Sequence, residues 1–144
     1  MEIRSPRTKE EFAQYYNLRW RILRAPWVHS KEPELDELDE NPDVVHMAAI
    51  DKGKVIGVGR GQMNSPDEGQ VRYMAVDESC RGKGAGGKIL SVIEREMAKN
   101  GAKYAVLNAR ENAVNFYMKH GYKIIREGPL IFGCIKHKFM RKEL

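Results

Sequence analysis

The residues of this chain best suited to chemistry are the glycines and cations between positions 81 and 88. Glycine has no Cβ atom, so a glycine-rich main chain can turn sharply and let an anion reach its N–H groups. The first N–H groups of a helix have no internal partner, and the helix dipole adds partial positive charge at that end. Arg81, Lys83 and Lys88 contribute formal charge. The segment is typical of a phosphate-binding loop, and a tight turn that needs glycine only for space is the alternative.

Three phosphate-site patterns can be compared with this loop. Gly82, Gly84 and Gly87 fit the G-x-G-x-x-G of dinucleotide sites, but a polar loop separates them from the preceding strand, and no acidic residue ends the next strand. The G-x-x-x-x-G-K pattern of nucleoside triphosphate loops lacks its magnesium-binding hydroxyl, because Ile89 takes that position. The pattern R-x-x-G-x-G, which begins at Arg81, fits without exception.

A second segment with chemical potential is A-x-x-F-Y-x-x-x-G-Y, over residues 113–122. Its apolar residues recur at helical spacing, so one stripe of the helix faces inward, and Gly121 ends the helix. Tyr117 lies on that stripe. It is either a core tyrosine with a satisfied hydroxyl or a proton donor in a reaction.

Hydrophobic periodicity around these two segments predicts alternating strands and helices. Thr8 and Glu11 form a capping box at the start of the first helix. This order indicates an α/β domain with a mixed sheet. Strands are predicted at 2–5, 44–50, 55–63, 70–76, 104–108, 122–126 and 131–140, and helices from residue 8 to about 26, from the glycine loop to 100, and from about 112 to 120.

Length and composition limit the class of protein. At 144 residues the chain is long enough for one core, so residues 1–144 are predicted to form a single domain. No apolar run approaches membrane length and the first residues are too charged for a signal peptide, which favours a cytoplasmic protein without a membrane partner. Cys80 and Cys134 lack ligand-type spacing around them, so neither a disulfide framework nor a metal site is predicted.

The net charge of +5 is unevenly distributed. Residues 31–43 hold seven acidic residues and one lysine, so the rest of the chain is strongly basic. The acidic run is either a solvated loop beside ordinary surface lysines, or an acidic rim for a cationic ligand on a protein whose basic surface binds a polyanion. A nucleic-acid partner is not favoured, because the cations are dispersed without aromatic interleaving or a binding motif.

Together these motifs resemble the GNAT superfamily of acyl-CoA-dependent N-acyltransferases, in particular small bacterial members of undefined substrate. The resemblance rests on the order strand, R-x-x-G-x-G loop, helix and strand, followed by the tyrosine helix. It implies the GNAT fold, with a mixed, mostly antiparallel central sheet of six to seven strands flanked by about four helices. It also implies acetyl-CoA as the co-substrate and no metal.

The resemblance implies roles for individual residues. In the family, backbone amides of the loop hold the CoA pyrophosphate, and the preceding strand splays at a bulge so that its free backbone groups bind pantetheine and polarise the thioester carbonyl. Tyr117 matches the tyrosine that protonates the departing thiolate, which suits a thiol with a pKa of roughly 8.5. The residues expected to contact the cofactor are Met74, Ala75, Val76, Arg81, Gly82, Lys83, Gly84, Ala85, Gly86, Gly87, Asn108, Asn112 and Phe116.

Two positions depart from the family pattern. Many members have asparagine three residues before the alanine of the tyrosine helix, where this chain has Arg110. Arg110 is expected to meet a phosphate instead, with Asn108 or Asn112 in the amide role. Gln70 occupies the position of the glutamate that serves some relatives as general base, and it cannot accept a proton at neutral pH. The remaining candidates for the catalytic base are Glu68, His46, His137 and a water chain.

Aromatic and charged residues near positions 20–40 are expected to shape the acceptor site, with Trp20 and Trp27 as substrate contacts beside Arg24 and the acidic run. Arg72 is the third predicted contact, because strand alternation places it where an unpaired charge is costly. It either binds a carboxylate on the substrate or pairs with an acid such as Asp36. His137 is either a satisfied histidine on the sheet face or part of the active site.

The sequence therefore predicts an acetyl-CoA-dependent N-acetyltransferase that moves an acetyl group to a primary amine by direct attack, without a metal or a covalent intermediate. The acceptor is expected to be an amine of a small molecule or peptide, and a homodimer is an expected assembly. A non-catalytic CoA- or nucleotide-binding sensor is the alternative, because it would keep the loop and need no acid. A nucleoside triphosphate hydrolase or kinase would need magnesium and would bind ATP.

Overall fold

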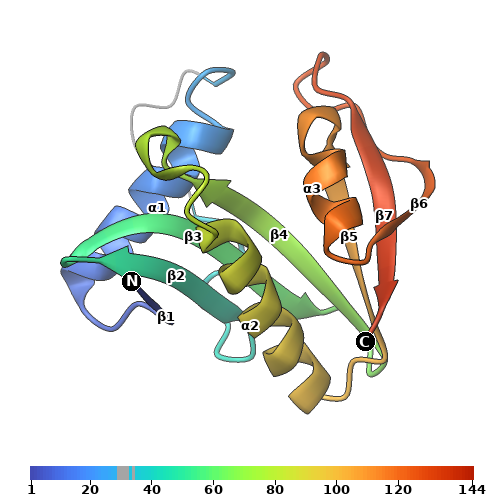
Figure 1. The fold of residues 1–144 in the computed structure, drawn as a ribbon, viewed down its shortest axis with the longest axis horizontal. Helices are drawn as coiled ribbons and strands as arrows, with labels where there is room; N and C mark the ends of the chain where they lie inside the picture. The colour runs from blue at the N-terminus through green and yellow to red at the C-terminus, as the bar shows by residue number, and fades with distance from the viewer. Residues whose placement is uncertain (29–32, 34) are drawn as a thin grey trace.

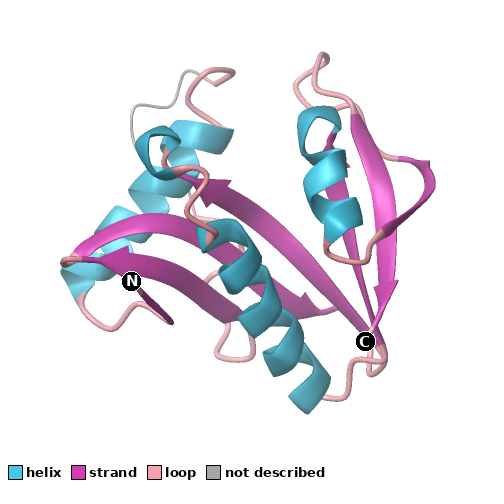
Figure 2. Cartoon of the chain, viewed as in Figure 1, coloured by secondary structure: helices cyan, strands magenta, loops and turns pink. Residues whose placement is uncertain are grey.

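The computed structural model describes residues 1–28, 33 and 35–144, which form one sheet flanked by helices (Figure 1, Figure 2). The described helices are α1 (Lys9–Leu23), α2 (Ala85–Lys99) and α3 (Val114–Lys119), with 3₁₀ turns at Glu78–Cys80 and Glu111–Ala113. The predicted α/β class and strand number are confirmed, with three α-helices where about four were expected. The strands are β1 (Glu2–Arg4), β2 (Val45–Asp51), β3 (Lys54–Met63), β4 (Glu68–Val76), β5 (Tyr104–Arg110), β6 (Lys123–Glu127) and β7 (His137–Glu143).

The strand order is β1-β2-β3-β4-β5-β7-β6, and every neighbouring pair is antiparallel except β4 and β5. These two strands pair only between Glu68–Gln70 and Tyr104–Val106. Beyond that point they diverge, and the β5, β6 and β7 part of the sheet separates from the rest (Figure 1). One edge of β4 is therefore left without a strand partner over its second half.

Helices α1 and α2 cover opposite faces of β3 and β4 (Figure 1). Apolar side chains of each helix are fully buried against the sheet, Tyr15 of α1 and Ile93 of α2 among them. Full burial of an aliphatic side chain such as that of Ile93 stabilises the fold by about 1.5–3 kcal/mol. Glycines on β3 let α2 approach closely, since a Cβ at Gly59 would lie 2.5 Å from Met74 Sδ and 2.9 Å from Ile93 Cδ1.

Strand β4 bulges where it faces the middle of β3. The register shifts opposite Gly59, so that Tyr73 and Met74 together oppose that single residue. Tyr73 has a φ of 58°, in the left-handed region that a bulky residue adopts only when its surroundings hold it there. The bulge implied for this strand by the family resemblance is thus present, and it bends β4 next to its free edge.

The strand predicted over residues 131–140 is wrong for residues 131–136, because β7 begins only at His137. Ile131 and Ile135 instead close a turn through an isolated β-bridge. Between them, Phe132 and Gly133 have φ values of 55° and 70°. Two successive left-handed residues reverse the chain, so the apolar alternation of this segment belongs to a hairpin-like loop.

Candidate active site

A cleft of about 840 Å³ lies between the diverging parts of β4 and β5. Its walls come from the end of α1, the second half of β4, the glycine loop with the first turn of α2, the end of β5, α3 and the loop between β6 and β7. Pockets of this volume typically hold small molecules or cofactors. The cleft brings the glycine loop and the tyrosine helix, which are separate in sequence, onto one site.

The glycine loop presents backbone to this cleft. Gly82 and Gly84 have φ values of 85° and 81°, and no described heavy atom lies within 4 Å of where a Cβ would stand at either. Gly84 is the N-cap of α2 and supplies no capping side chain. The N–H groups in the first turn of α2 are therefore available to an anion, which the helix dipole also attracts.

The two following glycines have a different role. A Cβ at Gly86 would lie 3.3 Å from Phe116 Cζ, and a Cβ at Gly87 would lie 2.7 Å from His120 Nε2. Helix α3 thus packs directly on the backbone of α2. The first two glycines shape the turn, and the last two make space for α3, so part of the alternative interpretation applies; phosphate binding by the loop stays a prediction.

Asp77 fixes the loop between β4 and α2. Its carboxylate accepts hydrogen bonds from the hydroxyl of Ser79 (2.7 Å), the backbone N–H of Ser79 (3.0 Å) and the guanidinium of Arg21 on α1 (2.8 Å). The bonds from Ser79, followed by the contact with Arg21, lower the pKa of Asp77 to about 2. The carboxylate is therefore charged at neutral pH and ties the loop to α1.

Tyr117 projects from α3 into the cleft with 8% of its surface exposed. No described group forms a hydrogen bond with its hydroxyl. Its neighbour Tyr122 behaves as a satisfied core tyrosine, since it donates to Glu94 Oε2 at 2.8 Å. Burial raises the pKa of Tyr117 above the ordinary value of 10.0, so the phenol keeps its proton at neutral pH and can donate it.

His137 is buried at the start of β7 and also lines the cleft. Its Nδ1 lies 3.1 Å from the carbonyl oxygen of Pro129 and 3.0 Å from that of Ile135. Carbonyl oxygens only accept, so Nδ1 carries the proton and Nε2 of the neutral ring keeps a lone pair. The side chain is thus held by the backbone while one nitrogen can accept a proton.

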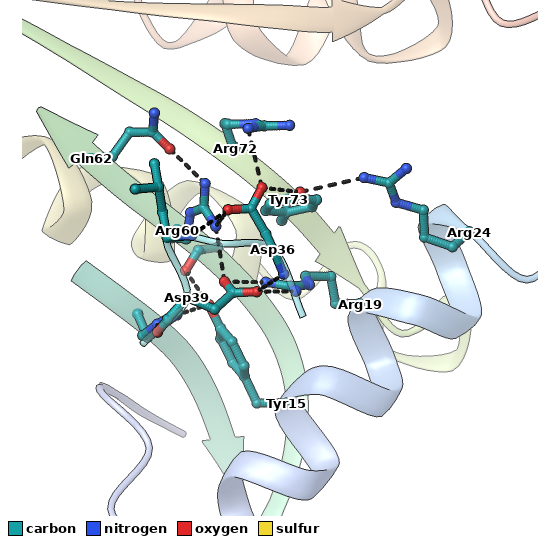
Figure 3. Close-up of polar contacts among 12 residues, drawn as sticks. Tyr15, Arg19, Arg24, Asp36, Asp39, Arg60, Gln62, Arg72 and Tyr73 are labelled. Carbon is teal, nitrogen blue, oxygen red and sulfur yellow. Dashed lines mark hydrogen bonds and ion pairs between the residues drawn. The ribbon is translucent and has the colours of Figure 1, made fainter. Parts of the chain in front are cut away.

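Asp36 and Asp39 of the acidic run point inward, toward arginines (Figure 3). Arg19 bonds both carboxylate oxygens of Asp39, at 2.9 and 2.6 Å, and Arg60 reaches Asp39 at 2.9 Å and Asp36 at 3.2 Å. Burial by itself would raise the pKa of Asp39, but the hydrogen bonds from Arg19, the Asp36 N–H and Arg60 outweigh it and hold that pKa well below its ordinary value. These acids neutralise buried guanidinium groups.

Tyr73 connects this network to the cleft (Figure 3). Its hydroxyl donates to Asp36 at 3.0 Å, and its ring centroid lies 4.2 Å from the guanidinium carbon of Arg19 and 4.9 Å from that of Arg60. Cations over an aromatic face stabilise the ring, which offsets its strained backbone angle. Arg72 pairs with Asp36 at 3.5 Å, which is one of the two arrangements predicted for it.

Two aromatic rings meet at the cleft. Trp27, after α1, and Phe132, in the turn before β7, are parallel within 1° at a centroid distance of 6.1 Å. Arg110 lies over Trp27 at 4.7 Å and donates to the carbonyl oxygen of Leu23 at 2.8 Å. Arg24 lies over Phe132 at 5.5 Å. These contacts join the end of α1 to β5 and to the β6–β7 loop.

Comparison with known proteins identifies the family. Residues 12–122 match the acetyltransferase (GNAT) family. The chain belongs to this family. It is 36% identical to a Bacillus subtilis protein named the uncharacterized N-acetyltransferase YjcF, over 78% of each chain.

Solved structures of GNAT proteins share the fold. An aminoglycoside 6′-N-acetyltransferase crystallised with coenzyme A superposes with a TM-score of 0.84 at 19% identity, over 99% of this chain and 97% of that one. A GNAT family acetyltransferase from Elizabethkingia anophelis with acetyl-CoA bound has a TM-score of 0.64 at 17% identity, over 71% of this chain and 77% of that one. At such low sequence identities, the structural similarity establishes a shared fold.

Within this GNAT domain, most of the predicted site residues line the one cleft. Those that do not are Glu68, Trp20, Lys83 and the alternative base candidate His46. Glu68 begins β4 at its paired end and accepts a hydrogen bond from Asn64 at 2.8 Å. The predicted residues at the cleft are Tyr117, His137, Met74, Ala75, Val76, Arg81, Gly82, Gly84, Ala85, Gly86, Gly87, Asn108, Asn112, Phe116, Trp27 and Arg72.

Other predicted features lie elsewhere. His46 forms hydrogen bonds through both ring nitrogens, with the Tyr15 hydroxyl at 2.9 Å and the Asp39 carbonyl at 2.7 Å, and does not line the cleft. The Nε1 atom of Trp20 is buried and has no acceptor among the described residues. Three charged residues of the predicted acidic run, Lys31, Glu32 and Glu34, lie outside the described residues.

Sequence reasoning missed Tyr73 and Phe132, both of which line the cleft of this GNAT domain. Their left-handed backbone angles are set by tertiary contacts, which leave no local signal in the sequence. A partial signal existed for Phe132, because the following Gly133 favours a turn.

Two further features concern metal binding and membrane-spanning helices. The described residues contain no group of three or more His, Cys, Asp or Glu side chains that could hold a metal ion. Among the described helices none is long and apolar enough to cross a membrane.

Proposed function

We propose that this GNAT domain transfers an acetyl group from acetyl-CoA to a primary amine by direct attack. One observation carries the proposal: the N-terminus of α2, the free edge of β4 and the unpartnered hydroxyl of Tyr117 face a single cleft. Membership of the acetyltransferase family and related folds crystallised with CoA or acetyl-CoA support it.

The backbone of the loop and of β4 binds the donor in this proposal. The N–H groups from Gly82 to Gly87 hold the pyrophosphate, and Arg81 adds a positive charge at the same place. The free edge of β4 over Met74–Val76 pairs with pantetheine, and its N–H groups polarise the thioester carbonyl. Stabilisation of the developing oxyanion by one such donor is worth about 2.7–4 kcal/mol.

Proton transfer is assigned to two side chains. His137 Nε2 takes a proton from the ammonium group of the acceptor, directly or through water, because His137 lines the cleft and its backbone contacts engage only Nδ1, whereas Glu68 lies outside the cleft. The amine nitrogen then bonds to the carbonyl carbon as the C–S bond breaks, and the nitrogen loses its second proton to the departing thiolate or to solvent, which leaves an amide and CoA. Tyr117 donates to the leaving sulfur, mainly as a hydrogen-bond donor, because its pKa is above the roughly 8.5 of a free thiol.

A CoA sensor without activity is the competing proposal, since it would use the same loop. Tyr117 argues for the enzyme, because a buried phenol without a described partner has no structural need for its hydroxyl. Location in the cytoplasm and self-association as a homodimer stay predictions, and analytical ultracentrifugation tests the second.

The test is thiol release from acetyl-CoA across a panel of primary amines, with isothermal titration of acetyl-CoA and ATP in parallel. Tyr117→Phe is expected to lower kcat by about 100-fold with little change in acetyl-CoA affinity. His137→Gln is expected to lower kcat in the same way and to flatten the pH dependence of kcat.

Tyr122→Phe is the matched control, because it removes the hydroxyl of a buried tyrosine that already has a partner. That variant should lose stability and keep kcat. Unchanged kcat in Tyr117→Phe would refute the acid role. Binding of acetyl-CoA without thiol release for any amine would favour the sensor, and tighter binding of ATP than of acetyl-CoA would refute both.

A further inference from the structure

The fully charged side chains that line the cleft among the described residues are all arginines. Its described lining includes Arg24, Arg72, Arg81 and Arg110 and neither aspartate nor glutamate. A cleft lined by one sign of charge concentrates ligands of the opposite sign. Asp36 and Asp39 of the acidic run do not offset this positive charge, because both already form ion pairs with arginines.

The four arginines differ in what already neutralises them. Arg81 belongs to the glycine loop and therefore to the donor end, and Arg72 pairs with Asp36. Arg24 and Arg110 have no carboxylate partner anywhere in residues 1–28, 33 and 35–144. Arg24 donates to the neutral hydroxyl of Tyr73 at 3.4 Å, and Arg110 donates to a backbone carbonyl.

These two arginines lie at the same part of the cleft. Arg110 covers the Trp27 ring and Arg24 covers the Phe132 ring, while the two rings stack on each other. Burial first, and the nearby charge of Arg24 second, lower the pKa of Arg110. An anion bound between two partly buried guanidinium groups would relieve their mutual repulsion and form charge-assisted hydrogen bonds with both.

We propose that Arg24 and Arg110 bind a carboxylate group carried by the amine acceptor. The acceptors of this enzyme are then amino acids or similar amines that bear a carboxylate, and not polycationic amines, which the arginines would repel. This inference rests on the proposed acetyl transfer. A carboxylate is favoured over a phosphate, because each guanidinium already uses part of its hydrogen-bonding capacity on Tyr73 or Leu23.

The experiment compares each ω-amino acid, from glycine to 6-aminohexanoate, with its own primary amide, which differs only in the charge of the terminal group. Rates are expressed per deprotonated amine, and phosphoethanolamine and spermidine complete the panel. The best carboxylate acceptor is expected to exceed its amide in kcat/KM by at least about tenfold, the size of one charge-assisted hydrogen bond.

Arg24→Gln and Arg110→Gln should each reduce that preference to near parity. The KM for acetyl-CoA should stay unchanged in Arg24→Gln, and a raised KM for acetyl-CoA in Arg110→Gln would instead assign Arg110 to the phosphate contact predicted from the sequence. Arg24→Lys keeps the charge and should retain most of the preference, which separates loss of charge from loss of folding. Arg95→Gln is the matched control, because Arg95 is exposed on α2 and lies outside the cleft. Equal or better use of the amides overturns the proposal, as does a preference for phosphoethanolamine or spermidine.

A binding measurement separates this inference from the proposed function. In a Trp20→Phe background, Trp27 is the remaining tryptophan, since the chain has two. Its fluorescence is titrated with propionate and with propionamide as probes. If no amine releases thiol, the proposed function fails. A response to propionate alone that Arg24→Gln abolishes then still supports the carboxylate site, and equal responses to both probes overturn it.

Discussion

The two ends of the cleft are built in different ways. At the donor end, where we propose that acetyl-CoA binds, the wall of the cleft is backbone of one continuous segment, Gly82–Gly87, whose shape is set by its glycines. At the acceptor end, side chains from α1, β4, β5 and the β6–β7 loop meet, with Trp27 and Phe132 in direct contact. A site made of local backbone is encoded by a short motif, whereas a site made of distant side chains depends on the whole fold.

Charge separates the two ends further. The cations of the glycine loop are exposed or at the surface of the cleft, where water screens them. Arg19 and Arg60, beneath the acceptor end, are buried at 4% and 0% exposure and depend on Asp39 for neutralisation. The acceptor end should therefore be the part of the site whose integrity is most sensitive to a single substitution.

The largest effect is expected from Asp39→Asn. It leaves the buried guanidinium groups of Arg19 and Arg60 without their shared carboxylate. Breaking a buried ion pair in this way typically costs about 3–5 kcal/mol. Urea unfolding at neutral pH, followed by circular dichroism, measures the change in the free energy of unfolding.

Asp43→Asn is the control for Asp39→Asn. Asp43 belongs to the same acidic run, but it is exposed and has no ion pair among the described residues. Its substitution should change stability by no more than about 0.5 kcal/mol. Equal effects of the two substitutions would contradict the distinction between a neutralising and a solvated acid.

These differences explain how much could be predicted from the sequence. The order of elements and the loop at Gly82–Gly87 followed from periodicity and motif spacing, because each depends on neighbours in the chain. The placement of Tyr117 at the cleft followed from the resemblance to the GNAT family, because periodicity alone is equally consistent with a core tyrosine. The inward direction of Asp36 and Asp39 did not follow, because an acidic run looks the same whether it is solvated or paired with buried arginines. Apolar alternation likewise predicts a strand at Phe132, because the alternation carries no information on backbone angles.

The donor end can be tested at Gly84, which has a φ of 81°. Gly84→Ala forces a residue with a Cβ into the left-handed region, at a cost of about 1–2 kcal/mol, and disturbs the N-terminus of α2. We expect a comparable loss of stability and a weaker affinity for acetyl-CoA of about tenfold. Isothermal titration and urea unfolding measure the two effects separately.

Gly53→Ala is the matched control for Gly84→Ala. Gly53 has a φ of 78° in the turn between β2 and β3, and no described heavy atom lies near a Cβ at that position. The strain is similar, so the loss of stability should be similar, but acetyl-CoA affinity should stay unchanged. Equal weakening of acetyl-CoA binding in both variants would remove the loop from the donor site.

The smallest effect concerns the contact that links the two ends, between Asp77 of the loop and Arg21 of α1. Arg21 is 41% exposed, so water screens this pair, and we expect it to contribute no more than about 1 kcal/mol. Asp77→Asn and Arg21→Gln, alone and combined, isolate the pair by a double-mutant cycle in urea unfolding.

The pH dependence of the free energy of unfolding tests the contribution of Asp77. The pKa of Asp77 is lowered from 3.8 to about 2, so folding favours its ionised form. The stability that it adds is fully present above the unfolded value of 3.8 and is lost as the pH falls through about 2. The wild type should therefore exceed Asp77→Asn in stability at neutral pH, and the difference should shrink across the acid range. A difference that is undiminished at pH 2 would mean that the hydrogen bonds of Ser79 and Arg21 do not depend on the charge of Asp77. The loop would then be held to α1 by contacts that do not require a charged Asp77.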